Sequence, residues 1–363
     1  MKKYNIFTIG TLLLCSIILV QNLQAQTPDD SEYIKKANKL HKRYLTIDTH
    51  NDAAMRINNP FGRYPAGSRG QVDFDLMKIG GLDAAVFAIY IKQGLRDEQS
   101  SLNAVQFVTV QIEKLKEFTS NHKEAALAKS QKELYRNKRK GLSSVVLGIE
   151  NGFAIGKDIN NVSKFASMGV RVMTICHSYN NDICDSSSDT LVEFNGLSTF
   201  GEQVIRKMNE AGIIVDVSHA SKETVLDVLK ISEYPIIASH SGAYSVNPSP
   251  RNLTDEEIIA IAKNGGVVQV VSLRSYLSSK PKEIVTVREM ADHIDYIKSL
   301  VGIKHVGIGT DFDGGGGVVG MEDASKMKSL TVELLKRGYT NKEIKLFWGG
   351  NFLRVLSKQK KSK

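Results

Sequence analysis

The sequence has 363 residues, a hydrophobic content of 42% and three cysteines. A chain of this size forms one large domain or two ordinary ones, and three cysteines exclude a disulfide-rich scaffold. The net charge of +9 comes partly from lysine runs at 132–140 and 358–363, but these runs lack the interleaved aromatic residues that single-stranded nucleic acid requires, which argues against a nucleic-acid partner.

The first 25 residues are typical of a secretory signal peptide. Lys2 and Lys3 precede an apolar stretch at 9–20, and Ala25 offers a small residue at the cleavage point. The apolar stretch is shorter than the roughly 20 residues that cross a bilayer. We therefore expect a cleaved signal peptide at 1–25, no stable membrane span, and export to the periplasm or the extracellular space. A leucine directly before Cys15 is unfavourable for lipoprotein processing, so we expect no lipid anchor.

Strand and helix patterns alternate along residues 26–363. In chain order, the apolar runs that predict strands are 45–52, 82–90, 143–150, 170–176, 213–218, 236–239, 266–272 and 305–310. The stretches that predict helices are 31–44, 74–79, 102–118, 123–140, one ending near Met168, 200–211, 221–230, 255–264, 287–301, 322–336, 342–346 and 349–356. Two stretches rich in turn residues, 58–70 and 180–196, predict long loops.

Eight strands, each followed by helical sequence and with no ninth strand, predict an α/β fold of the TIM-like (β/α)8 barrel type in one domain, 26–363. An open, doubly wound sheet is the alternative, but no GxGxxG follows the first strand. In a barrel, functional side chains lie at the C-terminal ends of the strands. Because metal-binding residue types recur at these ends, we expect a metal site at the C-terminal face.

The residues that carry this expectation are His50, Asp52, Glu150, His177, His219, His240 and Asp311. The first two are separated by one residue, so their side chains point to the same face of the first strand. Imidazole ligands suit Zn, Fe and Ni. A lone histidine at a strand end is usually structural, but four histidines with three carboxylates at one face indicate a metal centre.

The simplest division of these ligands is between two metal ions. His50 and Asp52 would hold one ion, His219 and His240 would hold the other, and Glu150 would place one oxygen on each. Two ions about 3.5–4 Å apart can share a hydroxide and polarise a substrate carbonyl. Each site would keep an open position, as catalytic zinc requires.

Three residues remain for the substrate and the proton. Asp311 is placed to take the proton of the attacking water and to give it to a leaving amine. His177 would donate a hydrogen bond to the developing oxyanion. Arg251, in the loop after the sixth strand, would bind a substrate carboxylate through two parallel hydrogen bonds, with an ordinary surface arginine as the alternative.

Several motifs resemble those of the membrane (renal) dipeptidase family of the amidohydrolase superfamily. They run in order along the chain: 48–52 (DTHND), 148–152 (GIENG), 216–219 (DVSH), 239–244 (SHSGAY), 250–252 (PRN), 307–314 (GIGTDFDG) and 349–355 (GGNFLRV). The resemblance implies a dipeptidase with two zinc ions and the ligand division given above. It also implies that His177 and Arg251 bind substrate and that Asp311 is the acid/base. The expected function is hydrolysis of L-L and L-D dipeptides with a free C-terminal carboxylate by a metal-bridged hydroxide.

Two departures from the family pattern concern substrate preference. The first motif continues as Ala53-Ala54-Met55, where the family often has a tryptophan. Ser272-Leu273-Arg274, which close the seventh strand, lack an aromatic residue that we expect near the substrate. Neither departure affects a predicted metal ligand, so we expect them to alter side-chain preference and not the type of reaction.

Two other functions compete with this one. The first is another hydrolase of the superfamily, acting on N-acyl amino acids or lactones; many of these bridge their metals with a carbamylated lysine on the fourth strand, where this chain has Cys176-His177. The second is a barrel used only for binding, which would not need the complete set of ligands. The sequence leaves open whether Cys176 pairs with Cys184 and whether the chain forms a homodimer.

Overall fold

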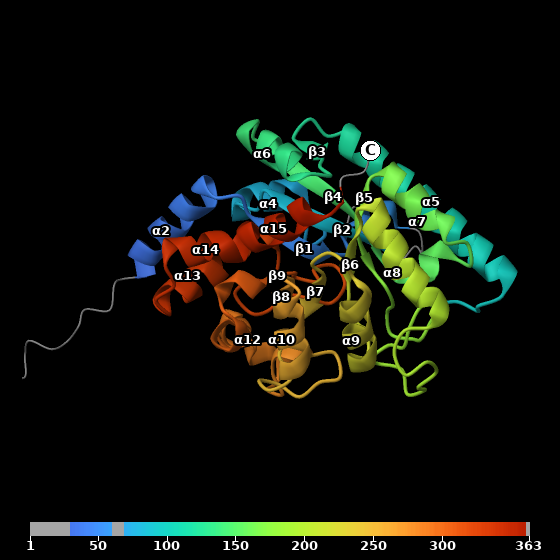
Figure 1. The fold of residues 1–363 in the computed structure, drawn as a ribbon. Coiled ribbons are helices and arrows are strands. Elements are labelled where there is room, and N and C mark those ends of the chain that lie inside the picture. The colour runs from blue at the N-terminus through green and yellow to red at the C-terminus, as the bar shows by residue number, and fades with distance from the viewer. Residues whose placement is uncertain (1–29, 60–68, 361–363) are drawn as a thin grey trace, which may run out of the picture.

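Parallel strands follow one another around the centre of the molecule (Figure 1). The computed structural model describes residues 30–59 and 69–360. The predicted signal peptide and most of the predicted loop 58–70 lie outside the described residues. In sheet order the strands are β1 (Ile47–Asn51), β2 (Ala84–Tyr90), β4 (Ser143–Glu150), β5 (Val170–Thr174), β6 (Ile214–Asp216), β7 (Ile237–Ser241), β8 (Val267–Val270) and β9 (Val306–Ile308). They form a nearly closed barrel and confirm the predicted fold class.

The segment after β9 lies beside β1 and brings the two ends of the sheet together. The backbone N–H of Asp311 donates to the carbonyl of His50 at 3.0 Å. Thr310 donates from its backbone N–H and its hydroxyl to the two carboxylate oxygens of Asp48, at 2.8 and 2.7 Å. Asp48 is fully buried, so these two bonds supply hydrogen-bond donors to a carboxylate that water does not reach. They also fix Asp311 next to His50.

Helices cover the outside of the barrel. They are α2 (Asp30–Arg43), α3 (Ala53–Asn58), α4 (Phe74–Gly80), α5 (Glu98–Ser120), α6 (Gln131–Arg139), α7 (Asn160–Met168), α8 (Thr199–Ala211), α9 (Lys222–Ile231), α10 (Asp255–Lys263), α11 (Arg274–Leu277), α12 (Val287–Val301), α13 (Lys328–Lys336), α14 (Asn341–Lys345) and α15 (Asn351–Lys358). Ser221 caps α9 as expected, because its hydroxyl accepts a hydrogen bond from the backbone of Thr224 at 3.2 Å. None of the described helices is long and apolar enough to cross a membrane.

The predicted helix at 123–140 is wrong in its first half, and so is the expectation of no ninth strand. A short strand, β3 (Ala125–Leu127), pairs in parallel with β4 outside the barrel path. The helix α6 starts only after Ser130, whose hydroxyl accepts a hydrogen bond from the backbone of Glu133 at 3.3 Å. Three half-buried residues among charged neighbours are too few to show a strand period in the sequence.

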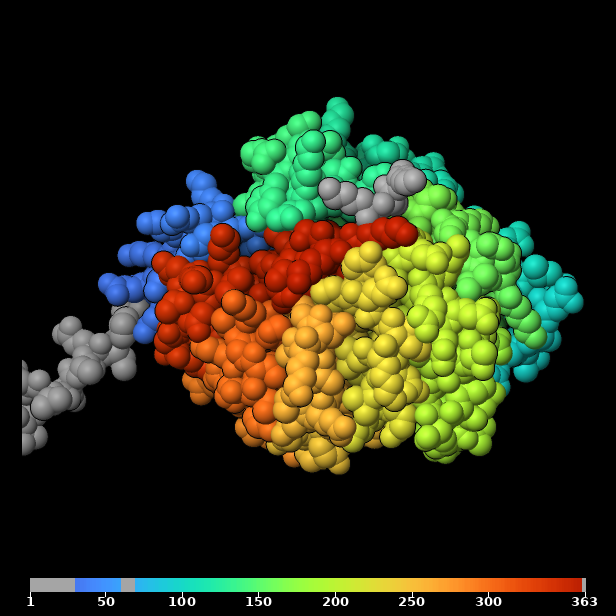
Figure 2. Space-filling view, in the orientation of Figure 1, coloured from blue at the N-terminus to red at the C-terminus, as the bar shows by residue number. Residues whose placement is uncertain are grey.

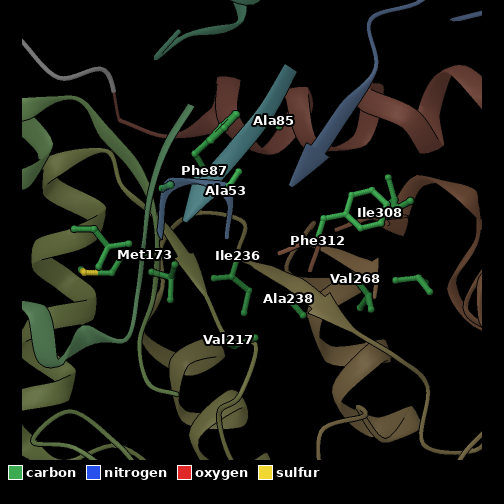
Figure 3. Close-up of a cluster of buried hydrophobic side chains, with 14 of the residues drawn as sticks. Ala53, Ala85, Phe87, Met173, Val217, Ile236, Ala238, Val268, Ile308 and Phe312 are labelled. Atoms are coloured by element: carbon green, nitrogen blue, oxygen red, sulfur yellow. The ribbon is translucent and has the colours of Figure 1, made fainter. Parts of the chain in front are cut away.

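Successive strand residues face two different hydrophobic layers. In β2, Ala84 and Val86 belong to a cluster at the N-terminal ends of the strands, whereas Ala85 and Phe87 pack between strands and helices. Figure 3 shows part of the second layer, to which several strands contribute. Figure 2 shows the red C-terminal segment lying across the face of the molecule between green and yellow to orange segments. Side chains of α15 belong to the first cluster and close that end of the barrel.

The same alternation explains why polar residues reach the barrel interior at its other end. Val146 of β4 belongs to the interior cluster, and Glu150 lies four residues further along the same face. Ile214 of β6 is likewise interior, and Asp216 is two residues on. Both carboxylates are buried, at 3% and 0% exposure. The strands therefore carry apolar side chains at one end of the barrel and acidic ones at the other.

A buried histidine on α2 should make the stability of the fold sensitive to acid. His41 Nδ1 donates to the carbonyl of Gly81 at 3.1 Å, and its Nε2 lies 2.6 Å from the hydroxyl of Thr331, which accepts from the indole of Trp348 at 2.7 Å. Because a carbonyl can only accept, this arrangement fits a neutral imidazole. Burial lowers the pKa of His41 from 6.5 to about 4.

Since the pKa of His41 is depressed in the folded state, its contribution to stability is complete above pH 6.5 and is lost as the pH falls towards 4. The loss between pH 7 and pH 5 is of order 2 kcal/mol. We expect a His41→Gln variant, in which nothing titrates at this position, to lose less stability than the wild type over that range. Urea unfolding of both proteins at pH 7 and pH 5, with chelator present, measures the difference; equal losses would contradict the assignment.

Candidate active site

All seven predicted metal-competent residues lie at the C-terminal ends of barrel strands or within three residues beyond them. His50 and Glu150 are in β1 and β4, and His240 is in β7. Asp52 directly follows β1. The others are His219 and Asp311, each three residues beyond the last residue of a strand, and His177, three residues beyond β5. The predicted strand containing 170–176 is therefore shorter than expected, and His177 stands in the loop that follows it.

The four histidines converge on one carboxylate oxygen. Glu150 Oε1 lies 3.6 Å from His50 Nε2, 3.8 Å from His177 Nε2, 3.2 Å from His219 Nε2 and 3.5 Å from His240 Nε2. The Nε2 atoms of His219 and His240 are 2.9 Å apart. The carboxylate of Asp52 approaches His50 Nε2 at 4.0 Å. Residues from five different strand ends therefore direct their ligand atoms to a single point.

The residues present fit metal ions. His50 Nε2 is buried and has no hydrogen-bond partner among the described residues. Burial lowers the pKa of His50 to about 3, which keeps its imidazole neutral and able to coordinate. Three groups of side chains bring their ligand atoms within 4.8 Å of one another: His50, Asp52 and Glu150; Glu150, His177 and His219; and His50, His240 and Asp311. The first group matches one site of the division expected from the sequence. The other two groups separate His219 from His240 and include His177 and Asp311, which were not predicted as ligands.

A buried hydrogen-bond network fixes the tautomer of His240. The hydroxyl of Ser239 donates to Asp216 at 2.6 Å and lies 2.8 Å from His240 Nδ1. A hydroxyl has one proton, so Ser239 must accept from Nδ1–H, which leaves the Nε2 lone pair facing Glu150. Asp216 also accepts from the hydroxyl of Thr174 at 2.5 Å. Asp216 was not predicted as a supporting residue. The feature of the sequence that could have indicated it is an aspartate at an interior position of an apolar strand.

Asp311 is held in a restricted geometry. Its backbone has φ 60°, in the left-handed region that is costly for most residues. Burial raises the pKa of its carboxyl group to about 7, while Arg251 and a hydrogen bond with Asp52 oppose the rise. Gly314 packs so closely against the Asp52 and Asp311 carboxylates that no side chain fits there. Position 314, the first of the four glycines at 314–317, is therefore a glycine for steric reasons.

A cavity of about 320 Å³ opens above the histidines. All of the predicted site residues line it except His50. Met55 and Leu273, from the two segments that depart from the family pattern, also line it. The other lining residues were not predicted as site residues: Asn59, Tyr90, Ser178, Tyr276, Asp313 and Gly314. A volume near the lower end of the range for small-molecule sites, about 300–1,000 Å³, suits a short ligand. Tyr90 is at the end of β2, on the interior face, and its ring is 4.8 Å from that of His177.

Arg251 is a component of this cavity and not a surface residue. It is 5% exposed, and its guanidinium lies 5.4 Å from the centre of the Tyr276 ring. Its guanidinium makes one long bond, of 3.4 Å, to the carbonyl of His240. No carboxylate of the described residues lies within ion-pair distance of it. Tyr276 also supplies the aromatic residue that appeared to be absent from 272–274: it lies slightly further on, in α11.

Comparison with known proteins decides the family. A profile described as membrane dipeptidase (peptidase family M19) matches residues 34–363. The chain belongs to the membrane dipeptidase family. It is 30% identical over 359 residues to dipeptidase ataJ of Aspergillus terreus, covering 90% of this chain and 88% of that protein. It is 32% identical to dipeptidase aclJ of Aspergillus oryzae, covering 79% and 69%.

Solved structures agree with this membrane dipeptidase assignment. The probable dipeptidase PvdM of Pseudomonas aeruginosa is 27% identical, with a TM-score of 0.82 and coverage of 90% of this chain and 98% of that one. A metallopeptidase of Rhodobacter sphaeroides, solved with a phosphinate mimic of L-Ala-D-Ala, shares the fold with a TM-score of 0.78 at 24% identity, over 87% and 99% of the two chains. The resemblance inferred from the motifs is confirmed, and the chain is a dipeptidase of a metallopeptidase family.

The long loop predicted at 180–196 supports the site of this membrane dipeptidase family member. The hydroxyl of Ser186 donates to the carbonyl of His177 at 2.5 Å, and the backbone N–H of Ser187 donates to the carbonyl of His219 at 2.8 Å. The loop thereby links two of the histidines. Cys176 and Cys184 are both buried and free, with the thiol of Cys184 hydrogen-bonded to Cys176. Cys184 lies within this loop and Cys176 precedes it, and both are outside the ligand cluster.

Proposed function

We propose that this protein hydrolyses dipeptides, L-L and L-D alike, with two zinc ions at the C-terminal face of the barrel. His50, Asp52 and Glu150 hold one ion, and Glu150, His219 and His240 hold the other. The observation that carries the proposal is the convergence of four imidazole nitrogens within 3.2–3.8 Å of Glu150 Oε1. One oxygen in that position is suited to a shared ligand.

The donor set favours zinc among the metals that proteins use. Imidazole nitrogens with carboxylate oxygens, and no thiolate in the cluster, are a common catalytic zinc environment. When bound, the ions supply Lewis-acid activation of water and of the substrate carbonyl. The ring nitrogens available for this are neutral, because burial lowers the pKa of every histidine in the cluster.

The remaining residues bind the substrate and move a proton. Arg251, buried and without a carboxylate partner among the described residues, accepts the C-terminal carboxylate of the dipeptide as a bidentate ligand. His177, whose Nε2 faces Glu150, donates to the oxygen of the scissile carbonyl as negative charge develops. Asp311, with a pKa of about 7, takes a proton from water and passes it to the leaving amine.

We also infer that the protein acts after export, with residues 1–25 removed. The basic and apolar segments of the N-terminus support this inference. N-terminal sequencing of the protein recovered from the exported fraction of a host cell tests it: a first residue at or near position 26 is expected. A full-length protein that stays inside the cell would contradict it.

A panel of dipeptides with D- and L-residues in both positions tests the proposed activity. We expect cleavage of L-L and L-D dipeptides built from Gly, Ala and Leu, and loss of cleavage when a chelator removes the metal. Tripeptides and dipeptide amides should not be cleaved, because neither presents a carboxylate at the distance that Arg251 requires. Equal rates on a dipeptide and its amide would contradict the carboxylate contact. Cleavage of N-acyl amino acids or lactones in place of dipeptides would favour the alternative hydrolase.

Replacing Arg251 by Met should raise the KM for dipeptides by roughly 10²-fold, since two charge-assisted hydrogen bonds are lost. Arg288→Met, at an exposed position of α12, is the matched control and should leave KM unchanged. Steady-state kinetics on one dipeptide, with zinc content measured for each variant, separates loss of substrate binding from loss of metal. An unchanged KM in the Arg251 variant would show that Arg251 does not bind the substrate carboxylate.

A further inference from the structure

We propose that a second cavity behind the active site holds an ordered water that hydrogen-bonds His219 and orients it as a metal ligand, with Ser187 as the positioning residue for that water. The inference rests on the metal-binding role proposed for His219. It assigns a function to the loop 180–196, which contains no other residue proposed to act in the reaction.

The second cavity has a volume of about 130 Å³. Its walls come from the loops after β5 and β6, the end of β7, the loop that joins β7 to α10 and the start of α10. They include Ser187, His219, Ser241, Arg251 and Glu257. It shares His219 and Arg251 with the active-site cavity, so these two side chains separate the two spaces. A water molecule occupies about 30 Å³, and the polar walls suit it.

Two buried atoms at this cavity have no hydrogen-bond partner among the described residues: His219 Nδ1 and Ser187 Oγ. The Nε2 of His219 faces Glu150 at 3.2 Å. Because one ring carbon separates the two nitrogens, Nδ1 bonds in a direction that diverges from that of Nε2. The backbone N–H of Ser187 donates to the carbonyl of His219 at 2.8 Å, which places the residues side by side. Both residues line the second cavity and no hydrogen bond joins their side chains, so one water placed between them would satisfy both atoms.

The two other histidines proposed as metal ligands show what His219 lacks. The hydroxyl of Ser239 lies near the Nδ1 of both, at 2.8 Å from His240 and 3.4 Å from His50. Metal-binding histidines almost always donate their second N–H to a carboxylate, a carbonyl or a water. His219 has no such protein group among the described residues, so a water must take that place.

The proton positions follow from this arrangement. His219 Nδ1–H donates to the water, which leaves the Nε2 lone pair free on the side of Glu150. The water in turn donates to Ser187 Oγ. A buried N–H without a partner destabilises the folded state, so the water also removes that penalty. Without it, the imidazole could adopt the other tautomer and present a proton to the metal.

A high-resolution crystal structure of the full chain tests the cavity directly. We expect an ordered water within about 2.7–3.2 Å of both His219 Nδ1 and Ser187 Oγ. A cavity without ordered water at this position, or a direct hydrogen bond between the two side chains, would overturn the proposal. This test does not depend on whether metal is bound.

The effect on metal binding is tested with three variants and a competing chelator. Ser187→Val removes the hydroxyl and fills its space, and should weaken binding of one of two zinc ions by roughly 10–100-fold. Ser187→Thr keeps the hydroxyl and should bind both ions like the wild type. Ser188→Val, at the exposed neighbouring position, is the matched control and should change nothing.

Zinc affinity that is equal in the Ser187→Val and wild-type proteins would overturn the positioning role. Equal weakening in the Ser187→Val and Ser188→Val proteins would do the same, because it would point to general damage of the loop. A wild-type protein that binds no zinc would instead contradict the proposed function, and the crystallographic water would still decide the inference about the cavity.

Discussion

A Glu150→Gln variant should lose both metal ions and its activity. The amide has no charge, and its nitrogen cannot coordinate, whereas the carboxylate oxygen it replaces is the one atom that all four histidine Nε2 atoms approach within 3.8 Å. Removing a single stabilising group from an active site already costs about 10²–10³-fold in turnover, and loss of a ligand shared by two ions should exceed that. Zinc content by elemental analysis, together with kcat/KM on a dipeptide, measures both effects.

Glu202→Gln provides the matched control for this substitution. Glu202 lies in the first turn of α8 and is exposed. Its replacement by Gln is the same chemical change, made outside the ligand cluster. It should keep two zinc ions per chain and the wild-type kcat/KM. If the Glu150 variant also retained two zinc ions, Glu150 would not be the bridging ligand, and His50, His240 and Asp311, the group that does not include Glu150, would become a metal site.

The order of the barrel strands could be predicted from the sequence because each strand is an apolar run bounded by turn or cap residues. The run 82–90 shows this well, since both of its faces are buried. The strand at Ala125–Leu127 could not be predicted in this way. It is three residues long, its side chains are only half-buried, and it depends on pairing with β4. Nothing local distinguishes such a segment from the helix that follows it.

The metal-competent residues could also be predicted, because strand ends in a barrel meet at one face. What the sequence did not supply is the support around them. Asp216 looks like part of a motif, and only its contacts show that it orients Ser239 and, through it, His240. Tyr276 lies in α11, beyond the end of β8, and only its contact with Arg251 shows that it lines the cavity. Contacts between loops have no periodic signal, so these partners require the three-dimensional structure.

An Asp311→Asn variant should keep its metal but lose turnover. Asparagine tolerates the left-handed backbone at this position better than most residues, so the fold should be preserved. The amide can neither take nor give the proton that the reaction moves. We expect kcat to fall by roughly 10²–10⁴-fold, the range for a general acid or base. Zinc content and kcat on a dipeptide, measured together, distinguish this role from that of a ligand.

Asp313→Asn is the control that makes this result decisive. Asp313 also has a left-handed backbone and lines the same cavity, but its carboxylate accepts hydrogen bonds from the backbone of Gln71 at 3.0 Å and of Val72 at 3.3 Å. The control should therefore lose stability and retain most of its kcat. If Asp311→Asn lost a zinc ion, Asp311 would belong with His50 and His240 as a ligand. If its kcat were unchanged, the proton would have to move through another group.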